Sequence, residues 1–383
     1  MRIALVLDRF ESNIGGLESW TEGLANWLVH RGHDVSVLCF KGTTKNSDVK
    51  LFILSGEGGP LARAATVAER LARLSFDIVH DTGTADQADV FQPQTGSRLI
   101  NAELDLATRR LGRRLRARLS PGFQVWCREI HRLERRQFTD PSRLIAVSWM
   151  VRNQIASRYD LDASKIRVIH NGVDTSRFTA DRLMALRGWA RAKWLLGEAI
   201  NFVLVANNFE LKGVDTALQA LTLLSNSKLN IRLTVAGAGD VMRYSRLAHR
   251  LGIASQVHFL GRIQHIEEAY AAADVALQPT RYDACSLATL EGLASGLPTI
   301  TTCNNGAGEL ITSDKEGIVL DHATDAGALA QAMRRLLHSD LRRNMGLAAR
   351  VLGRRHDVEA NYLAVEGFYR RALRSKVDSV TAD

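Results

Sequence analysis

Short apolar runs alternate with amphipathic segments along most of the chain. Near its start, apolar runs at 3–7 and 35–39 flank a segment at 17–30 whose apolar residues recur at helical spacing. Short apolar runs bounded by turn residues are typical of strands buried on both faces, so the three segments form a predicted strand–helix–strand unit. This pattern favours an α/β fold built on parallel sheets.

The second half of the chain repeats the alternation after a turn at Asn171–Asp174, which we interpret as a hinge. We therefore expect one Rossmann-like domain at 1–172, with a basic helical insert at about 98–138, and another at 173–355, followed by a helix at 356–383. The other predicted strands lie at 77–80, 144–147, 166–169, 202–206, 231–236, 257–260, 275–277 and 298–302.

Length and composition narrow the class of protein. A chain of 383 residues exceeds the size at which one core keeps growing, and 46% hydrophobic with 24% charged residues is ordinary for a globular enzyme. No apolar stretch is long enough to span a membrane, and the run at 3–7 is too short for a signal peptide, so we expect a cytoplasmic protein. The cysteines lack paired metal-ligand spacing, so we expect reduced thiols and no structural zinc; they are Cys39, Cys127, Cys285 and Cys303.

The formal net charge of +9 is unevenly distributed, and much of it falls in the segment 109–136. A helical projection places Ala107, Leu111 and Leu115 on one stripe with arginines roughly opposite, as in a helix lying on a membrane surface. An anionic membrane or phosphorylated glycolipid is the first interpretation, a solvated helix balanced by Glu129 and Glu134 follows closely, and nucleic acid is a distant third because no nucleic-acid module surrounds the segment. Its arginines are Arg109, Arg110, Arg113, Arg114, Arg116, Arg118, Arg128, Arg132, Arg135 and Arg136.

Two carboxylates near residue 287 suggest a nucleotide site. Asp283 lies in the loop after the strand at 275–277, and Ser286 is a predicted cap of the helix that carries Glu291. The free N–H groups and dipole of a helix N-terminus attract an anion such as a diphosphate, and Glu291 is placed to accept hydrogen bonds from ribose hydroxyls. Taken alone, Glu291 reads as a solvated helix residue. The permissive loop at 304–309 favours a crevice at the carboxyl ends of parallel strands.

Basic and glycine residues follow other predicted strands. Lys212 follows the strand at 202–206 and could pair with a diphosphate, although a surface lysine is the commoner case. Gly237 ends the next strand and leaves room in the crevice. Gly15 and Gly16 would let a phosphate or sugar approach the backbone, or form an ordinary turn. The spacing of a dinucleotide fingerprint is absent around them, which weakens a dehydrogenase interpretation.

Polar residues also follow the strand at 77–80. Among them His80 is a candidate for acid–base chemistry, although a lone histidine is more often structural. Asp160 and Asp162 lie between a helix and a strand, so we interpret them as a polar turn and not as a metal-binding carboxylate pair. The further candidates in the first domain are Asp81, Asp89, Gln94 and Thr95.

Together these residues resemble the retaining glycosyltransferases of family four, which have the GT-B arrangement of two Rossmann-like domains facing across a cleft. The most specific part is the stretch from Asp283 to Glu291, similar to the family's Glu, seven residues, Glu motif, with Gly-Leu-Pro at 296–298. The segments 209–215 and 89–91, with the basic insert, resemble the lipopolysaccharide core heptose glucosyltransferases within that family. Other similar segments are 15–18, 31–33, 171–174, 212–213 and 257–261.

The resemblance implies a UDP-sugar donor, with UDP-glucose foremost, bound without a metal mainly by the second domain. It implies a glycolipid or oligosaccharide acceptor on the first domain, terminal helices that cross back to that domain, and a place on the inner face of the cytoplasmic membrane. Glu291 would bind ribose, Lys212 the diphosphate, Gly16 the phosphate or donor sugar, and Asp283 the sugar hydroxyls. The remaining implied donor contacts are Gly15, Asn207, Gly237, Arg262, Ile263, Ser286, Leu287 and Ala288.

The chain departs from the family pattern at three places. Asp283 is one methylene shorter than the usual Glu, Asn207 stands where many relatives have an arginine, and the family's first-domain histidine has no secure match, so that His80 and the surroundings of Gln94 are only candidates. A nucleotide-sugar epimerase and a non-catalytic nucleotide-sugar-binding protein remain alternatives. Release of UDP in the presence of an acceptor separates a transferase from both.

Overall fold

The computed structural model describes residues 1–11, 15–108, 111–225 and 229–381, and the chain divides into two compact units. The first unit comprises Met1–His170 together with Asn361–Asp383, and the second comprises Asn171–Ala360. Most of the last helix therefore belongs to the first unit, although it follows the second in sequence. Each unit contains a parallel sheet flanked by helices, which confirms the predicted α/β class.

The sheet of the first unit has the order β5-β3-β1-β6-β7, and all of its pairings are parallel. From β1 the chain first adds β3 and β5 on one side, and it later adds β6 and β7 on the other. The strand order therefore reverses between β1 and β6. Ile3 of β1 accordingly lies between Val35 and Ile78. The strands are β1 (Arg2–Val6), β3 (Asp34–Cys39), β5 (Lys50–Ile53), β6 (Ile78–Asp81) and β7 (Val90–Phe91), with the short pairs β2 (Arg9–Phe10) with β4 (Lys41–Gly42) and β8 (Ile145–Ala146) with β9 (Arg167–Val168).

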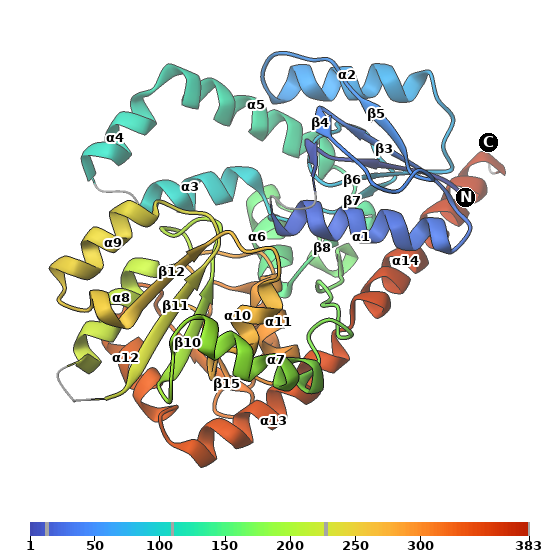
Figure 1. Cartoon of the computed structure of the whole chain (residues 1–383). Coiled ribbons are helices and arrows are strands. Elements are labelled where there is room, and N and C mark those ends of the chain that lie inside the picture. The colour runs from blue at the N-terminus through green and yellow to red at the C-terminus, as the bar shows by residue number, and fades with distance from the viewer. Residues whose placement is uncertain (12–14, 109–110, 226–228, 382–383) are drawn as a thin grey trace. The chain divides into compact units, whose positions relative to one another are not determined.

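Helices cover the sheet of the first unit, and α14 packs beside α1 although it comes from the far end of the chain (Figure 1). The Nε1 atom of Trp20 in α1 donates to Oδ1 of Asn361 in α14 at 2.9 Å. The predicted basic insert consists of the three helices α3, α4 and α5. The helices are α1 (Gly16–His30), α2 (Pro60–Ala72), α3 (Arg98–Thr108), α4 (Leu111–Leu119), α5 (Pro121–Gln137), α6 (Trp149–Tyr159) and α14 (Val358–Thr381).

The sheet of the second unit has the order β12-β11-β10-β13-β14-β15, again entirely parallel. It is the Rossmann order, and its reversal lies between the neighbouring strands β10 and β13. The strands are β10 (Ile200–Val205), β11 (Ile231–Ala236), β12 (Val257–Gly261), β13 (Val275–Gln278), β14 (Thr299–Thr302) and β15 (Gly317–Leu320). The helices are α7 (Ala180–Lys193), α8 (Val214–Ser225), α9 (Val241–Arg250), α10 (Ile266–Ala271), α11 (Leu287–Ala294), α12 (Ala326–Arg335) and α13 (Ser339–Arg355).

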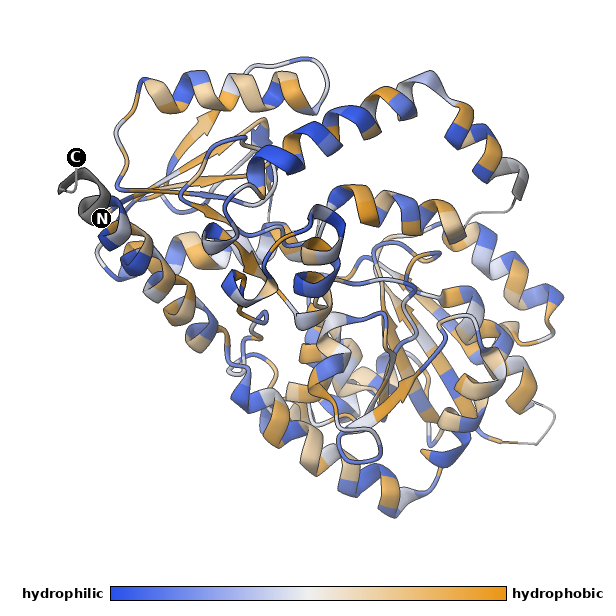
Figure 2. Cartoon of the chain, turned by 180° about the vertical axis from the view of Figure 1, so that it is seen from behind, coloured by the Kyte–Doolittle hydropathy of each residue, from blue (hydrophilic) through white to orange (hydrophobic). Residues whose placement is uncertain are grey.

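Burial of the strands on both faces explains why they read as apolar runs. Phe202, Leu233 and Ile300, on three different strands, are fully buried and pack in one core with Leu218 of α8 and Leu329 of α12. The strands of both sheets are mostly hydrophobic in Figure 2, whereas α5 is mostly hydrophilic. Among the described residues, no helix is both long enough and apolar enough to cross a membrane.

Candidate functional site

The reversal point of the second sheet brings two of the candidate residues together. Lys212 follows β10 and Asp283 follows β13, and these strands are neighbours. The Lys212 Nζ atom donates to Oδ2 of Asp283, and the two side chains are 19% and 16% exposed. Loops that leave a parallel sheet at such a point diverge toward opposite faces and open a crevice between them. An ion pair of predicted ligand-binding residues therefore lies at the point of the sheet where such folds bind their ligands.

The loop that carries Lys212 is held against the loop after β13. Gly213 has φ +72°, and a Cβ atom there would overlap the carbonyl oxygen of Pro279. The side chain of Arg281 reaches back across the same contact, because Nη1 donates to the carbonyl of Glu210 at 2.6 Å and Nη2 to Oδ2 of Asp215 at 2.6 Å. Glycine at 213 is thus a steric requirement. The role of Arg281 could not be predicted from the sequence, since its partners lie some seventy positions away.

Helix α11 begins a few residues after Asp283, at the same edge of the sheet. Ser286 is its N-cap, and its Oγ atom accepts from the backbone N–H of Thr289 at 3.3 Å, so the predicted cap is present. Leu287 and Ala288 form the first turn, where backbone N–H groups have no intrahelical acceptors. These groups and the helix dipole make the start of α11 suitable for an anion.

Glu291 lies one turn further along α11, partly buried, with one carboxylate oxygen fixed and the other open. The hydroxyl of Tyr270 donates to Oε2 at 2.8 Å, while no partner for Oε1 lies in the part of the chain that the structure describes. The Tyr270 ring is buried and packs edge-on against Phe178, with the ring centroids 5.5 Å apart. Burial raises the pKa of Glu291, whereas the Tyr270 hydrogen bond and the Arg177 charge lower it. The open oxygen is the one available to accept a ligand's hydroxyl.

The loop after β14 fixes the backbone around Asp283. The N–H of Asp283 donates to the carbonyl of Asn304 at 3.0 Å, and the N–H of Gly306 donates to the carbonyl of Asp283 at 2.8 Å. The side chain of Asn305 donates to Thr289 at 2.8 Å and accepts from the N–H of Ser286 at 3.3 Å. The sequence predicted a permissive loop here; that Asn305 ties β14 to the start of α11 is visible only in the structure.

The remaining predicted donor contacts of the second unit lie along the same edge of the sheet. Asn207 is exposed directly after β10, and Arg262 and Ile263 follow β12. Gly237 follows β11 with φ +122°, and a Cβ atom there would overlap the carbonyl oxygen of Ala206. These residues share the carboxyl edge with Lys212 and Asp283, and their roles as ligand contacts stay predictions.

Gly15 and Gly16 occupy the start of α1, beside the reversal point of the first sheet. Gly15 is the N-cap with an extended backbone, and Gly16 is the first helical residue. A Cβ atom on Gly15 would lie 2.7 Å from Oε2 of Glu18, so glycine leaves space for that side chain as well as for a ligand.

The structure places His80 in the interior of the first unit, which argues against its predicted catalytic role. Its ring is 1% exposed, its Nδ1 atom contacts the hydroxyl of Tyr369, and the Trp20 ring lies edge-on with centroids 6.1 Å apart. Burial lowers the pKa of His80 to about 3, so the ring is neutral at physiological pH. This placement supports the structural interpretation of His80.

The other first-unit candidates have structural contacts. Asp81 is buried and accepts from the N–H groups of Gly83, Thr84 and Ala85 at 2.8 Å each; burial raises its pKa to about 6. Asp89 accepts from the N–H of Val79 at 2.8 Å.

The last two first-unit candidates are Gln94 and Thr95. Gln94 is buried and Thr95 is exposed. Separately, Asp160 and Asp162 form the polar turn that the sequence predicted. Asp160 is a left-handed C-cap of α6, and Asp162 accepts from the N–H of Ser164 at 3.0 Å.

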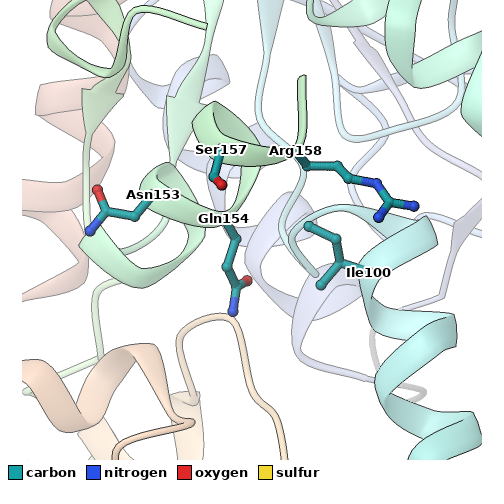
Figure 3. Close-up of a pocket in the computed structure, with 5 residues that line it drawn as sticks. All are labelled: Ile100, Asn153, Gln154, Ser157 and Arg158. Carbon is teal, nitrogen blue, oxygen red and sulfur yellow. The ribbon is translucent and has the colours of Figure 1, made fainter. Parts of the chain in front are cut away.

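An open pocket of about 610 Å³ lies between α3 and α6 in the first unit (Figure 3). Ile100 comes from α3, and the amide, hydroxyl and guanidinium groups that line the rest come from α6. Arg158 in this pocket also donates to Glu103 at 2.8 Å. The sequence did not point to this pocket. Its other lining residues are Asn153, Gln154 and Ser157.

The basic helices expose apolar side chains. Leu115 and Leu119 of α4 are 50% and 72% exposed, Val125 of α5 is 47% exposed, and the rings of Phe123 and Trp126 stack with centroids 6.0 Å apart. Arg109 and Arg110 lie outside the described residues, as does the side chain of Arg113.

Glu134 does not balance the arginines as the solvated-helix interpretation assumed. It is 1% exposed and accepts from Oγ of Ser97 at 2.8 Å, from the N–H of Arg98 at 2.6 Å and from the hydroxyl of Tyr159. A carboxylate used in this way holds α5 against α3 and leaves the exposed basic face without that counter-charge.

The fold of the chain is that of the GT-B glycosyltransferases. The solved structure of WaaG, a glycosyltransferase involved in lipopolysaccharide biosynthesis, superposes with a TM-score of 0.80 over 95% of this chain and 98% of its own, at 22% identity. Anabaena HepE in complex with UDP and glucose gives 0.74 over 96% and 98%, at 16% identity.

Family comparisons then place the chain more narrowly. The model for glycosyl transferases group 1 matches residues 190–351, and that for glycosyltransferase family 4 matches residues 110–177. The chain belongs to the family-four glycosyltransferases, as the sequence motifs indicated.

Two curated relatives illustrate the range of the family. The lipopolysaccharide glucosyltransferase WaaG of Escherichia coli K12 is 29% identical over 181 residues, which is 47% of this chain and 48% of that protein. The match thus spans about half the length of that relative. The GDP-mannose-dependent alpha-(1-6)-phosphatidylinositol monomannoside mannosyltransferase of Mycobacterium tuberculosis H37Rv is 27% identical over 84% of this chain and 85% of its own length.

Proposed function

We propose that the protein transfers a hexose from a UDP-sugar, UDP-glucose foremost, to a hydroxyl of a glycolipid or oligosaccharide, with retention at the anomeric carbon. The observation that carries the proposal is the grouping of Lys212, Asp283 and the start of α11 at the reversal point of the second sheet, with Glu291 one turn further along that helix. A lipopolysaccharide core acceptor is the leading candidate, because one relative is a lipopolysaccharide glucosyltransferase.

Each residue of the grouping has a separate part in the proposed donor complex. Oε1 of Glu291 accepts from ribose hydroxyls, and Asp283 accepts from hydroxyls of the transferred sugar. Lys212 and the N–H groups at the start of α11 stabilise the negative charge that develops on the leaving diphosphate. These groups take the place of a metal ion in the proposal.

The proposed reaction depends mainly on positioning. The acceptor hydroxyl enters from the face on which UDP departs, so that the bond from the anomeric carbon to phosphate oxygen breaks while the bond to the acceptor oxygen forms. The proton of the acceptor hydroxyl passes to the departing phosphate oxygen. Holding both substrates in register lowers the entropy cost of the step. The first unit supplies the acceptor site in this proposal.

The basic helices α4 and α5 are proposed to hold the protein at an anionic membrane surface on the cytoplasmic side. Exposed leucines and a stacked aromatic pair accompany the arginines there, which is the combination that interfacial helices use. Such a location would bring the protein close to a lipid-linked acceptor.

The donor and reaction type are tested by measuring nucleotide release from several UDP- and GDP-sugars, with and without extracted glycolipid. Acceptor-dependent UDP release is the expected result. Release of GDP instead would move the donor assignment toward the mannosyltransferase relative. Sugar interconversion without nucleotide release would show an epimerase, and donor binding without turnover would show a binding protein.

A further inference from the structure

The second unit already contains an ion pair where the proposed diphosphate would bind. Lys212 and Asp283 are more than four-fifths buried, so water screens their attraction only partly. In the proposed function Lys212 contacts phosphate oxygens. The ammonium group must therefore leave Asp283 or be shared with it when a nucleotide binds.

Asp283 has little freedom to move away from an incoming phosphate. Its backbone N–H and carbonyl are both hydrogen-bonded to the 304–306 loop, at 3.0 and 2.8 Å. The backbone beside Lys212 is constrained in the same way by the close approach of Gly213 to Pro279. A diphosphate that reaches Lys212 thus meets a carboxylate that only side-chain rotation can displace.

We propose that Asp283 competes with the diphosphate for Lys212, so that the protein holds a nucleoside diphosphate less tightly than the intact nucleotide sugar. This inference depends on the proposed function and adds a second role for Asp283. In the nucleotide sugar, hydroxyl groups donate to Asp283 and offset its repulsion of the phosphates. After transfer those hydroxyls are gone, and the carboxylate opposes the phosphates directly.

The consequence is faster departure of UDP once the sugar has been transferred. Product release limits the turnover of many enzymes, so a carboxylate that weakens only the product complex raises the overall rate. Asp283 thereby strengthens the binding of the nucleotide sugar and weakens the binding of the UDP product.

Neutralising Asp283 tests the competition because it is expected to raise the affinity for UDP and to lower the turnover of UDP-glucose. We expect Asp283→Asn to tighten UDP binding by about five- to thirtyfold, since one like charge is removed from near the phosphates. We expect turnover with UDP-glucose to fall, because sugar hydroxyls lose their acceptor. Titration calorimetry with uridine, UMP and UDP, together with steady-state kinetics, measures both; uridine affinity stays unchanged because uridine has no phosphate.

Two substitutions serve as matched controls. Asp283→Glu keeps the charge, so its UDP affinity stays near that of the parent protein. Glu291→Gln neutralises a carboxylate on the neighbouring helix and is expected to weaken uridine and UDP alike. A higher salt concentration reduces the gain in Asp283→Asn, since the effect is electrostatic.

The outcomes separate failure of this inference from failure of the proposed function. If Lys212→Ala and Glu291→Gln weaken UDP binding but Asp283→Asn does not tighten it, the competition is wrong and the nucleotide site stands. If Lys212→Ala and Glu291→Gln leave UDP binding unchanged, the proposed function is wrong as well. If Asp283→Glu tightened UDP binding as much as Asp283→Asn, the effect would come from side-chain shape and not from charge. That result would also overturn the competition.

Discussion

At the residue scale, the site depends on side chains whose orientation is set by buried neighbours. Tyr270 fixes one oxygen of Glu291 and leaves the other open, which suits Glu291 to the proposed ribose contact. Tyr270 in turn is held by its burial and by the edge of the Phe178 ring. A carboxylate that is already oriented loses little rotational freedom when a ribose binds.

Replacing Glu291 tests the proposed ribose contact. Glu291→Ala is expected to lower kcat/KM for UDP-glucose about tenfold to a hundredfold, because hydrogen bonds to a charged acceptor are lost. The matched control is Glu198→Ala, which removes an exposed carboxylate just before β10, at the amino end of the sheet. Unchanged kinetics in Glu291→Ala would remove Glu291 from the donor site.

The KM for UDP-glucose is expected to rise as the pH falls through the pKa of Glu291. Burial raises this pKa, so the loss of the accepting carboxylate begins at a higher pH than for an ordinary glutamate. Tyr270 and Arg177 lower the pKa and Glu267 raises it. In Tyr270→Phe the hydrogen bond that lowers the pKa of Glu291 is absent, so the rise in KM at acid pH should begin at a higher pH than in the parent protein.

A purely structural role for Tyr270 makes a different prediction. If Tyr270 is only structural, its replacement would lower protein stability or raise KM by the same factor at every pH. The pH at which KM begins to rise would then stay the same. A KM profile measured from pH 4 upward in both proteins, alongside thermal unfolding, distinguishes the two roles.

At the element scale, the loops that follow parallel strands are shaped by close backbone approaches. The loop after β10 can lie against the loop after β13 only because Gly213 has no side chain. Asn305 similarly ties the loop after β14 to the start of α11 through two side-chain hydrogen bonds, with Ser286 and Thr289. Two more, with Thr301 and Ala307, hold it against β14 and its own loop. The crevice is therefore a property of three strand ends acting together.

A pair of glycine substitutions isolates this steric requirement. Gly213 and Gly252 both have φ +72°, but a Cβ atom on Gly252 has no heavy atom within 4 Å. Gly252→Ala should destabilise the protein by about 1 kcal/mol through backbone strain alone. Gly213→Ala should cost about 1 to 3 kcal/mol more and also weaken UDP binding, as measured by chemical unfolding and calorimetry. Equal effects of the two substitutions would contradict the steric argument.

The sequence predicted most elements of this fold because their signals are local. Buried strands such as β10 and β13 contain continuous apolar runs, at 202–205 and 275–277. Ser286 indicates the start of α11 because serine is a common helix N-cap. The short strand β5 escaped prediction because it is largely not buried, so its pattern is weak.

The parts that the sequence could not predict are contacts between distant positions. Tyr270 looks like any helical aromatic until its hydroxyl is placed beside Glu291, 21 positions later. Arg281 and Asn305 likewise act through partners that only folding brings near. The sequence left both an acid–base and a structural role open for His80, and only the structure shows that its ring is buried against Tyr369.

At the scale of the whole molecule, much of the positive charge lies on the helices of the basic insert, α4 and α5. Helices α4 and α5 expose basic and apolar side chains, and Glu134 is committed to buried contacts. In the proposed function the two units bind the substrates, and this separate surface binds the membrane.

Vesicle binding tests the basic surface. Replacing Arg114, Arg116 and Arg118 together by glutamine should weaken binding to anionic vesicles about a hundredfold, since each basic residue near such a surface contributes on the order of 1 kcal/mol. The control replaces Arg343, Arg354 and Arg355 of α13, exposed arginines that change the net charge equally. Equal binding of the parent protein to neutral and anionic vesicles would contradict the electrostatic proposal.

The last helix has a consequence for how the protein is made. Trp20 bonds to Asn361, 341 positions later, and Tyr369 covers His80. A ribosome that has finished residues 1–170 has therefore produced a first unit whose interior is still open on one side. That unit can close only after the entire second unit has been translated, so the earliest part of the chain to emerge is among the last to reach its native packing.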